Sequence, residues 1–136
     1  VPRVDRYKLD ATTLRHSIEQ FARDLLGTLA GEISVTLNRL AVTHAGDEKM
    51  DLGTIVLENG RLEMGRRLKP VLEAGSDARL LRFDSSEEAF RTFFGLVVRD
   101  VQIRLLLGDD LELSQDDIDR DARRATEQFL TLYERR

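Results

Sequence analysis

Apolar residues recur every three or four positions through most of this chain, and that period predicts α-helices rather than strands. The clearest stripe runs from Leu14 to Leu29, after Asp10, which can cap a helix, and before Gly31. Further helices are expected at Glu32–Ala45, Asp51–Asn59, Arg61–Glu73 and Gln115–Tyr133. Pro70 predicts a kink or a broken turn in the fourth of the five segments, and Gly75–Asp77 is expected to form a loop after it.

Two helix starts carry a capping signature in the sequence. Ser85 is followed three residues later by Glu88, and Ser114 is followed three residues later by Asp117. A serine hydroxyl can accept a hydrogen bond from a first-turn N–H, and Glu88 can also reach back to its cap. Asp117 places a negative charge in the first turn, where the helix dipole favours it. Helices are therefore expected to begin after Ser85 and Ser114.

The stretch Asp84–Gly108 has the strongest helical pattern in the chain, with no proline and only Gly95 before its final glycine. About two dozen residues at a rise of 1.5 Å predict one continuous helix roughly 36 Å long, ended by Gly108 in the left-handed conformation. Its apolar residues form two faces, with Phe90, Phe93, Phe94, Val97, Val98, Val101 and Leu105 on one and Leu96, Ile103 and Leu107 on the other.

A helix with two apolar faces must be covered on both sides. The domain core supplies one cover. The second is either another layer of the same chain or a partner subunit, and the small number of other helices favours the partner. The last helix adds Ala122 and Ala125, whose small side chains allow another helix to approach closely.

The composition agrees with one helical domain over residues 1–136. Apolar residues make up 41% of the chain and charged residues 34%, as in globular helix-rich proteins. No repeat or low-complexity linker divides the sequence. The expected fold class is therefore all-α, a bundle of about five to seven helices.

The charge balance does not indicate that this chain binds nucleic acid by itself. The 21 basic and 25 acidic residues give a net charge of −4, and short basic runs such as Arg66–Lys69 are typical of solvated surface. No apolar run approaches the length of a membrane span. The absence of cysteine excludes disulfides and is compatible with the cytoplasm, which is the expected location.

The sequence shows no motif for catalysis, metals or cofactors. His16 and His44 belong to no zinc or di-iron helix motif, and neither a nucleophile elbow nor a phosphate-binding glycine loop is present. The paired acids Asp109–Asp110 and Asp116–Asp117 lie in a loop and at a helix start, where solvation and the helix dipole explain them. We therefore expect no catalytic residue, no metal ligand, no cofactor and no enzyme activity.

Two segments near the C-terminus follow each other in order, Glu87–Gly108 and, after a short acidic loop, Asp121–Tyr133. Together they resemble the last two helices of the TetR family of transcriptional regulators. The earlier segments FARDLL, LNRLAV and DLGTIVLENG resemble its regulatory domain in order and spacing, so the resemblance covers about residues 14–133.

The resemblance implies the regulatory half of such a protein, which binds a small effector and forms a homodimer. Family members read operator DNA with an N-terminal helix-turn-helix domain, and nothing ahead of Asp10 matches one. Operator DNA is therefore expected to be a partner only through that N-terminal domain, which we expect this chain to lack. Effector binding would shift the dimer between arrangements that differ in DNA binding.

The predicted effector pocket lies among the helices at Leu14–Leu29, Glu32–His44 and Arg61–Glu73, closed by the long helix. Candidate lining residues for a small apolar or amphipathic effector are Phe21, Leu25, Leu40, His44 and Phe94. Candidate homodimer residues are Leu96, Ile103, Leu107, Ala122, Ala125, Phe129 and Leu130. The competing hypotheses are a helical adaptor without a small-molecule site and a small helical enzyme, which the absence of catalytic motifs disfavours.

Overall fold

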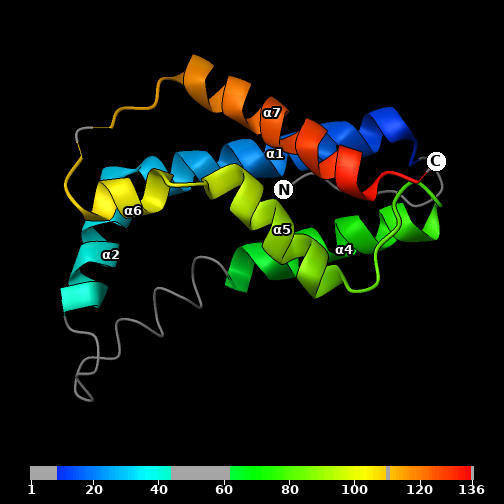
Figure 1. The fold of residues 1–136 in the computed structure, drawn as a ribbon, viewed down its shortest axis with the longest axis horizontal. Coiled ribbons are helices and arrows are strands. Elements are labelled where there is room, and N and C mark those ends of the chain that lie inside the picture. The colour runs from blue at the N-terminus through cyan, green and yellow to red at the C-terminus, as the bar shows by residue number, and fades with distance from the viewer. Residues whose placement is uncertain (1–8, 44–61, 110, 136) are drawn as a thin grey trace.

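The computed structural model describes residues 9–43, 62–109 and 111–135, and these form an all-helical bundle (Figure 1). Its helices are α1 (Ala11–Ala30), α2 (Glu32–Thr43), α4 (Glu63–Asp77), α5 (Ser86–Val98), α6 (Val101–Leu106) and α7 (Gln115–Tyr133). The all-α prediction is confirmed, and the described residues contain no strand beyond one isolated bridge. The helix expected at Asp51–Asn59 lies outside the described residues.

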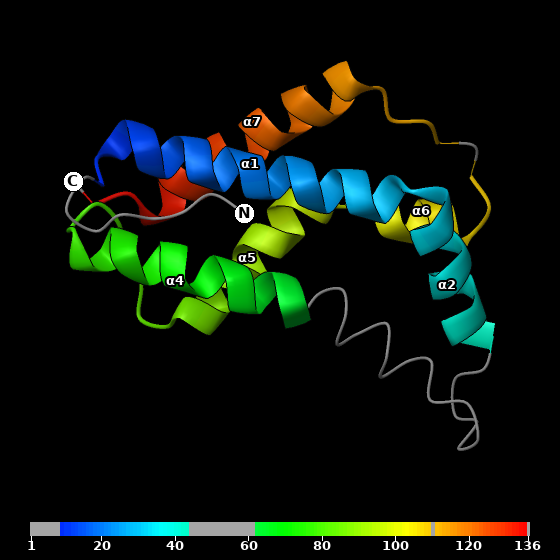
Figure 2. The same cartoon turned by 180° about the vertical axis from the view of Figure 1, so that it is seen from behind.

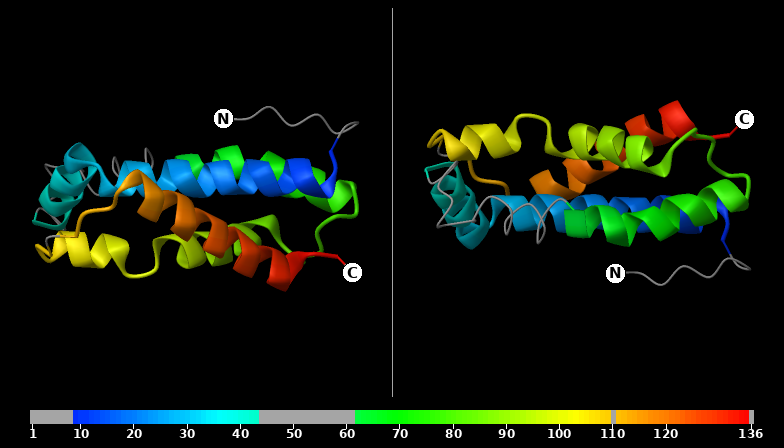
Figure 3. Two further views of the ribbon diagram at one scale, coloured as in Figure 1. Left: turned by 90° about the horizontal axis from the view of Figure 1, so that it is seen from above. Right: turned by 90° about the horizontal axis from the view of Figure 1, so that it is seen from below.

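Helix α1 is the longest element and lies at the centre of the bundle. Figures 2 and 3 show α7 along one side of α1 and α4 along another, and α1 makes its most extensive contact with α7. Asp10 caps α1 as predicted, because its carboxylate accepts a hydrogen bond from the N–H of Thr13 at 2.7 Å. The predicted stripe is buried from Leu14 to Leu26.

Helix α4 runs through Pro70 and continues to Asp77, so the loop predicted at Gly75–Asp77 is wrong. Gly75 is buried under Leu81, and a Cβ atom added to this glycine would lie only 2.8 Å from the leucine side chain. The carbonyl of Gly75 accepts hydrogen bonds from the N–H groups of Leu80 and Leu81. Glycine is therefore present for close packing, and the chain leaves the helix at Arg79, which has a φ of 62°.

The single long helix predicted for Asp84–Gly108 is also wrong, because the chain turns at Arg99 and Asp100 and forms α5 and α6. The turn allows α5 to pack on α4 and α7 while α6 packs on α1 and α2. One straight helix could not make both sets of contacts. The predicted ends of the stretch are correct. Ser85 Oγ accepts from the N–H of Glu88 at 3.3 Å, and Gly108 has a φ of 87°.

Helix α7 closes the bundle and fixes the connection between α4 and α5. The N–H of Arg82 donates to the carbonyl of Tyr133 at 2.7 Å, and the N–H of Arg135 donates to the carbonyl of Leu80 at 3.0 Å. The Tyr133 hydroxyl hydrogen-bonds Thr92 Oγ1 at 3.0 Å. The C-terminal end of α7 is thereby tied to α5 and to the loop before it.

An aromatic contact joins α5 to α7 inside the core. Phe129 is 1% exposed, and its ring meets that of Phe93 edge-on at 5.8 Å between centroids. The centroid of the Tyr133 ring lies 4.9 Å from that of Phe129. None of the helices in the described part of the chain is both long and apolar enough to cross a bilayer.

Truncation of Phe129 to alanine should lower the free energy of unfolding by about 3–5 kcal/mol, since it removes a buried ring and leaves a cavity. Urea denaturation followed by circular dichroism measures this change. Arg123→Ala on the exposed side of the same helix is the control and should stay within about 0.5 kcal/mol of the unmodified chain. Equal losses for the two variants would contradict the assignment of Phe129 to the core.

Candidate functional site

None of the three main grooves in the described part of the chain is lined by more than one of the predicted pocket residues. Phe21 and Leu25 are 1% and 4% exposed, because they form part of the filled core around α1. Phe94 is half-buried on α5, with its ring centroid 6.0 Å from that of Phe90. Leu40 lies on α2 with 43% of its surface exposed, and His44 lies outside the described residues.

A groove between α4 and α5 is the best candidate for a small-molecule site in the described part of the chain. Its volume is about 470 Å³, within the range of small-molecule pockets. An apolar floor is supplied by Leu62, Gly65 and Phe90, and a Cβ atom added at Gly65 would lie 3.2 Å from the Phe90 ring. The glycine therefore allows the Phe90 ring to pack closely against α4 at the floor of the groove.

The rim of this groove is mainly basic. Arg66, Lys69 and Arg91 line it, against the single carboxylate of Glu87. Arg66 also pairs with Glu63 at 3.3 Å, and the amine of Lys69 lies 3.9 Å from a carboxylate oxygen of Glu73. Exposed pairs of this kind are weak, so both cations remain available to a ligand. The arrangement fits an amphipathic molecule with an apolar ring and an anionic group.

Sequence reasoning missed this groove and treated Arg66 and Lys69 as ordinary solvated surface. A signal was present, because Leu62, Gly65, Arg66 and Lys69 are spaced to share one face of a helix. The sequence does not show which surface of α5 faces this side of α4. Only the packing of α4 beside α5 places Phe90 and Arg91 opposite that face.

A second groove, of about 710 Å³, follows α1 between the start of α4 and the start of α7 and includes Phe21. Its lining is largely polar, and several of its polar groups are already paired. The amide of Gln20 donates to Asp24 at 2.9 Å, and Arg67 lies 3.0 Å from Glu63. Because small-molecule sites are mostly apolar, this groove is the weaker candidate.

The residues predicted for a homodimer interface fall into two groups. Ala122, Ala125, Phe129 and Leu130 are each at most 6% exposed, because α7 uses them to pack within the subunit. A partner would therefore have to contact their exposed neighbours. Ile103 and Leu107 on α6 are 53% and 80% exposed, and Leu96 on α5 is half-buried.

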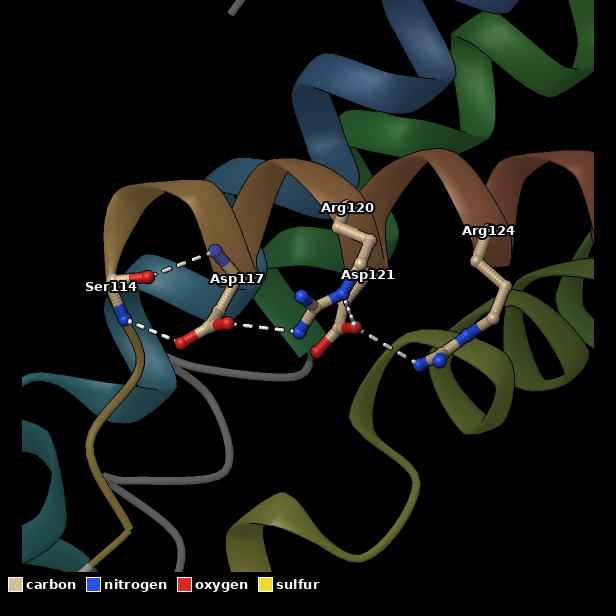
Figure 4. A network of polar contacts seen from close by, with 5 residues as sticks. All are labelled: Ser114, Asp117, Arg120, Asp121 and Arg124. Atoms are coloured by element: carbon tan, nitrogen blue, oxygen red, sulfur yellow. Dashed lines mark hydrogen bonds and ion pairs between the residues drawn. The ribbon is translucent and has the colours of Figure 1, made fainter.

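The first half of α7 presents a charged surface (Figure 4). Ser114 and Asp117 form a reciprocal capping box, in which each side chain accepts a hydrogen bond from the other's backbone N–H. Arg120 joins Asp117 at 2.9 Å, and Asp121 connects Arg120 to Arg124 along the helix. The second half of α7, residues 125–133, carries one charged side chain, that of Glu127.

The outward sides of α5 and α7 form a surface that could receive another helix. Leu132 on α7 is 61% exposed. A Cβ atom added at Gly95, on the exposed side of α5, would meet nothing within 4 Å. Figure 1 shows the two helices adjacent on one face of the bundle, and Thr92 and Tyr133 join them by a hydrogen bond. An exposed leucine on one helix and an open glycine position on the adjacent helix are suited to close packing of a further helix.

Comparison with known proteins gives a match over most of the chain. Residues 16–135 match the family described as AefR-like transcriptional repressor, C-terminal domain. A TetR transcriptional regulator from Agrobacterium tumefaciens is 41% identical, with a TM-score of 0.81 over 99% of this chain and 65% of that one. No curated protein matched the sequence.

Two other solved structures share the fold. The flavonoid-responsive regulator FrrA is 26% identical, with a TM-score of 0.79 over 100% of this chain and 66% of that one. A structure described as a TetR-family regulator from Mesorhizobium loti MAFF303099 has a TM-score of 0.79 at 21% identity, over 95% of this chain and 62% of its own. This chain thus spans 62% to 66% of the three structures.

The capping box gives α7 a stability that depends on pH. The backbone N–H of Ser114 hydrogen-bonds the Asp117 carboxylate and, with the Ser114 side chain and Arg120, holds its pKa below the ordinary value of 3.8. A lowered pKa adds stability above pH 3.8, and that stability is lost as the pH falls through the pKa of the folded state. Asp117→Asn should therefore have a lower Tm than the unmodified chain above pH 3.8, and this difference in Tm should become smaller below pH 3.8.

The matched control is Asp116→Asn, which removes a charge from the same helical turn without touching the capping box. The difference in Tm between Asp116→Asn and the unmodified chain should be smaller than that for Asp117→Asn. Thermal unfolding of the three proteins across this pH range provides the comparison. A gap for Asp117→Asn that stays constant in acid would contradict the role assigned to its carboxylate.

Proposed function

This chain belongs to the TetR family of transcriptional regulators, as a C-terminal regulatory domain of the AefR-like type, and we propose that it binds a small effector and forms a homodimer. The family consists of transcriptional regulators, so the chain is not an enzyme. In the full-length regulator, effector binding would be coupled to operator binding by a DNA-reading domain, in the cytoplasm. The coupling free energy in such systems is about 1–3 kcal/mol.

The observation that supports effector binding is the groove between α4 and α5. It places an aromatic ring and a bare glycine next to three basic side chains. The apolar floor would hold a ring system, and the basic rim would orient an anionic group. The similar structure FrrA is a flavonoid-responsive regulator, so flavonoids are the first natural compounds to test.

The observation that supports homodimerisation is the outward surface of α5 and α7. Gly95 leaves room for a partner helix, and Leu132 supplies exposed apolar area. A C2 dimer through this surface would form a four-helix interface, with two helices from each subunit. The exposed residues Ile103 and Leu107 would extend it onto α6.

Replacement of Arg91 with glutamate should weaken binding of an anionic aromatic probe by about tenfold or more, because a cation at the groove becomes an anion. Anilinonaphthalene sulfonate is a suitable probe, and its fluorescence gives the Kd directly. Arg123→Glu makes the same charge change on α7, away from the groove, and should leave the Kd unchanged. Absence of probe and flavonoid binding to the unmodified chain would favour a helical adaptor without an effector site.

Introduction of arginine at Gly95 should weaken dimerisation by roughly 100-fold or more, since a long charged side chain would occupy the space for the partner helix. Sedimentation at micromolar concentration gives the mass of each variant. Gly27→Arg is the matched control, because a Cβ atom at Gly27 on α1 also meets nothing within 4 Å. That variant should remain dimeric.

Two outcomes would count against this interface. A monomeric mass for the unmodified chain would refute the homodimer, and a stable dimer of Gly95→Arg would place the interface elsewhere. Ile103→Asp reports whether the interface extends onto α6. Because Ile103 is 53% exposed in the subunit, this substitution buries no charge unless a partner covers it.

A further inference from the structure

The junction between α5 and α6 contains a residue in an unfavourable backbone conformation. Arg99 has a φ of 48° and a ψ of −123°, a region that residues with a side chain rarely adopt. No glycine or proline lies between Leu96 and Leu107 to make the turn easier. Such a conformation persists only where the surrounding structure holds it, and residues of this kind gather at switch regions.

The sequence around the junction favours a different structure, a continuous helix. Val97, Val101 and Leu105 follow at intervals of four residues, and they are 3%, 8% and 8% exposed. In an uninterrupted helix these three side chains would share one face, as they would need to in order to stay buried. The apolar pattern is therefore compatible with both the bent and the straight arrangement.

The backbone hydrogen bonds also favour the straight arrangement. A continuous helix would pair the N–H groups of residues 100–103 with the carbonyls of residues 96–99. The turn at Arg99 interrupts this series, and α6 begins at Asp100 without a hydrogen bond from its side chain. The bent arrangement thus has an unfavourable backbone conformation and an uncapped helix start.

Contacts from α2 compensate for these costs. Arg39 on α2 donates a hydrogen bond from Nη2 to the carbonyl of Leu105 at 2.6 Å. This carbonyl lies in the last turn of α6, where a cation is favourable, and it also accepts a hydrogen bond from the N–H of Gly108 at 3.2 Å. A helix of six residues is too short to be stable alone, so the direction of α6 depends on this bond and on its packing against α1 and α2.

We propose that Arg99 and Asp100 form the hinge of a two-state switch and that Arg39 is its latch. In the bent state α6 packs on α2, as observed here. In the straight state α5 and α6 form one helix, and α6 leaves α2. Straightening relieves the backbone of Arg99 and completes the helical hydrogen bonds, while it gives up the Arg39 bond and the packing of α6 on α2. Any event that moves α2 would then change α5, whatever the effector or the dimer interface.

Amide hydrogen exchange of residues 100–103 distinguishes the two states, because these amides are paired along a helix only in the straight one. Two substitutions at the hinge have opposite backbone preferences. Glycine accepts a positive φ and disfavours a helix, whereas alanine disfavours a positive φ and favours a helix. Both remove the Arg99 side chain, so they form a matched pair.

We expect exchange of these amides to slow by about tenfold in Arg99→Ala and in Arg39→Ala, and to stay fast in Arg99→Gly. The double variant Arg39→Ala/Arg99→Gly should exchange as fast as Arg99→Gly, because glycine restores the bent state after the latch is lost. Arg123→Ala on α7 is the control for removal of an exposed arginine and should leave these amides unchanged.

Core amides of α1 and α7 are the reference for a folded subunit in every variant. Slower exchange limited to the junction in Arg99→Ala, with the core unchanged, supports the switch. Equal exchange in Arg99→Ala and Arg99→Gly would overturn it, because the junction would then be a fixed loop. Faster exchange at the junction in Arg39→Ala would also overturn it, since loss of the latch would loosen α6 rather than extend α5.

Discussion

The packing of α1 against α7 is the interaction on which the rest of this structure depends. Both helices bury small residues in their contact surfaces, with Ala22 on α1 and Ala122 and Ala125 on α7 at most 2% exposed. Small side chains let helix axes approach closely, and larger neighbours such as Ile18 and Phe129 then fill the space around them. The one buried hydroxyl of α7, on Thr126, is satisfied by the carbonyl of Ala122 at 2.8 Å, so it leaves no unpaired group.

This pairing decides where a ligand or a partner could bind. The apolar stripe of α1 is used by α4, α5 and α7, and its large side chains fill the core between them. Space for a small molecule in the described residues therefore lies in surface grooves, of which the one between α4 and α5 has the more apolar floor. In the same way, most apolar residues of α7 are buried inside the subunit, and Leu132 is left exposed on the outward surface that we propose for a partner.

The junction at Arg99 shows how tertiary contacts override local preference. The sequence favours a continuous helix there, yet α5 packs on α4 and α7 while α6 packs on α1 and α2. A local cost at one residue is thus balanced by contacts made far from it in sequence, such as that of Arg39 with Leu105. A balance of this kind is sensitive to small changes, and the proposed switch depends on that sensitivity.

The sequence by itself determined the fold class, most helix positions, the caps at Asp10, Ser85 and Ser114, and the family. These features depend on local spacing and on side chains that act within one helical turn. The tertiary structure decided the turn at Arg99, the helical course through Gly75 and the groove on which Phe90 and Arg91 meet α4. It also decided which apolar residues are buried within the subunit. Each of these depends on contacts between segments far apart in the chain, and periodicity along one segment contains no information about its neighbours in space.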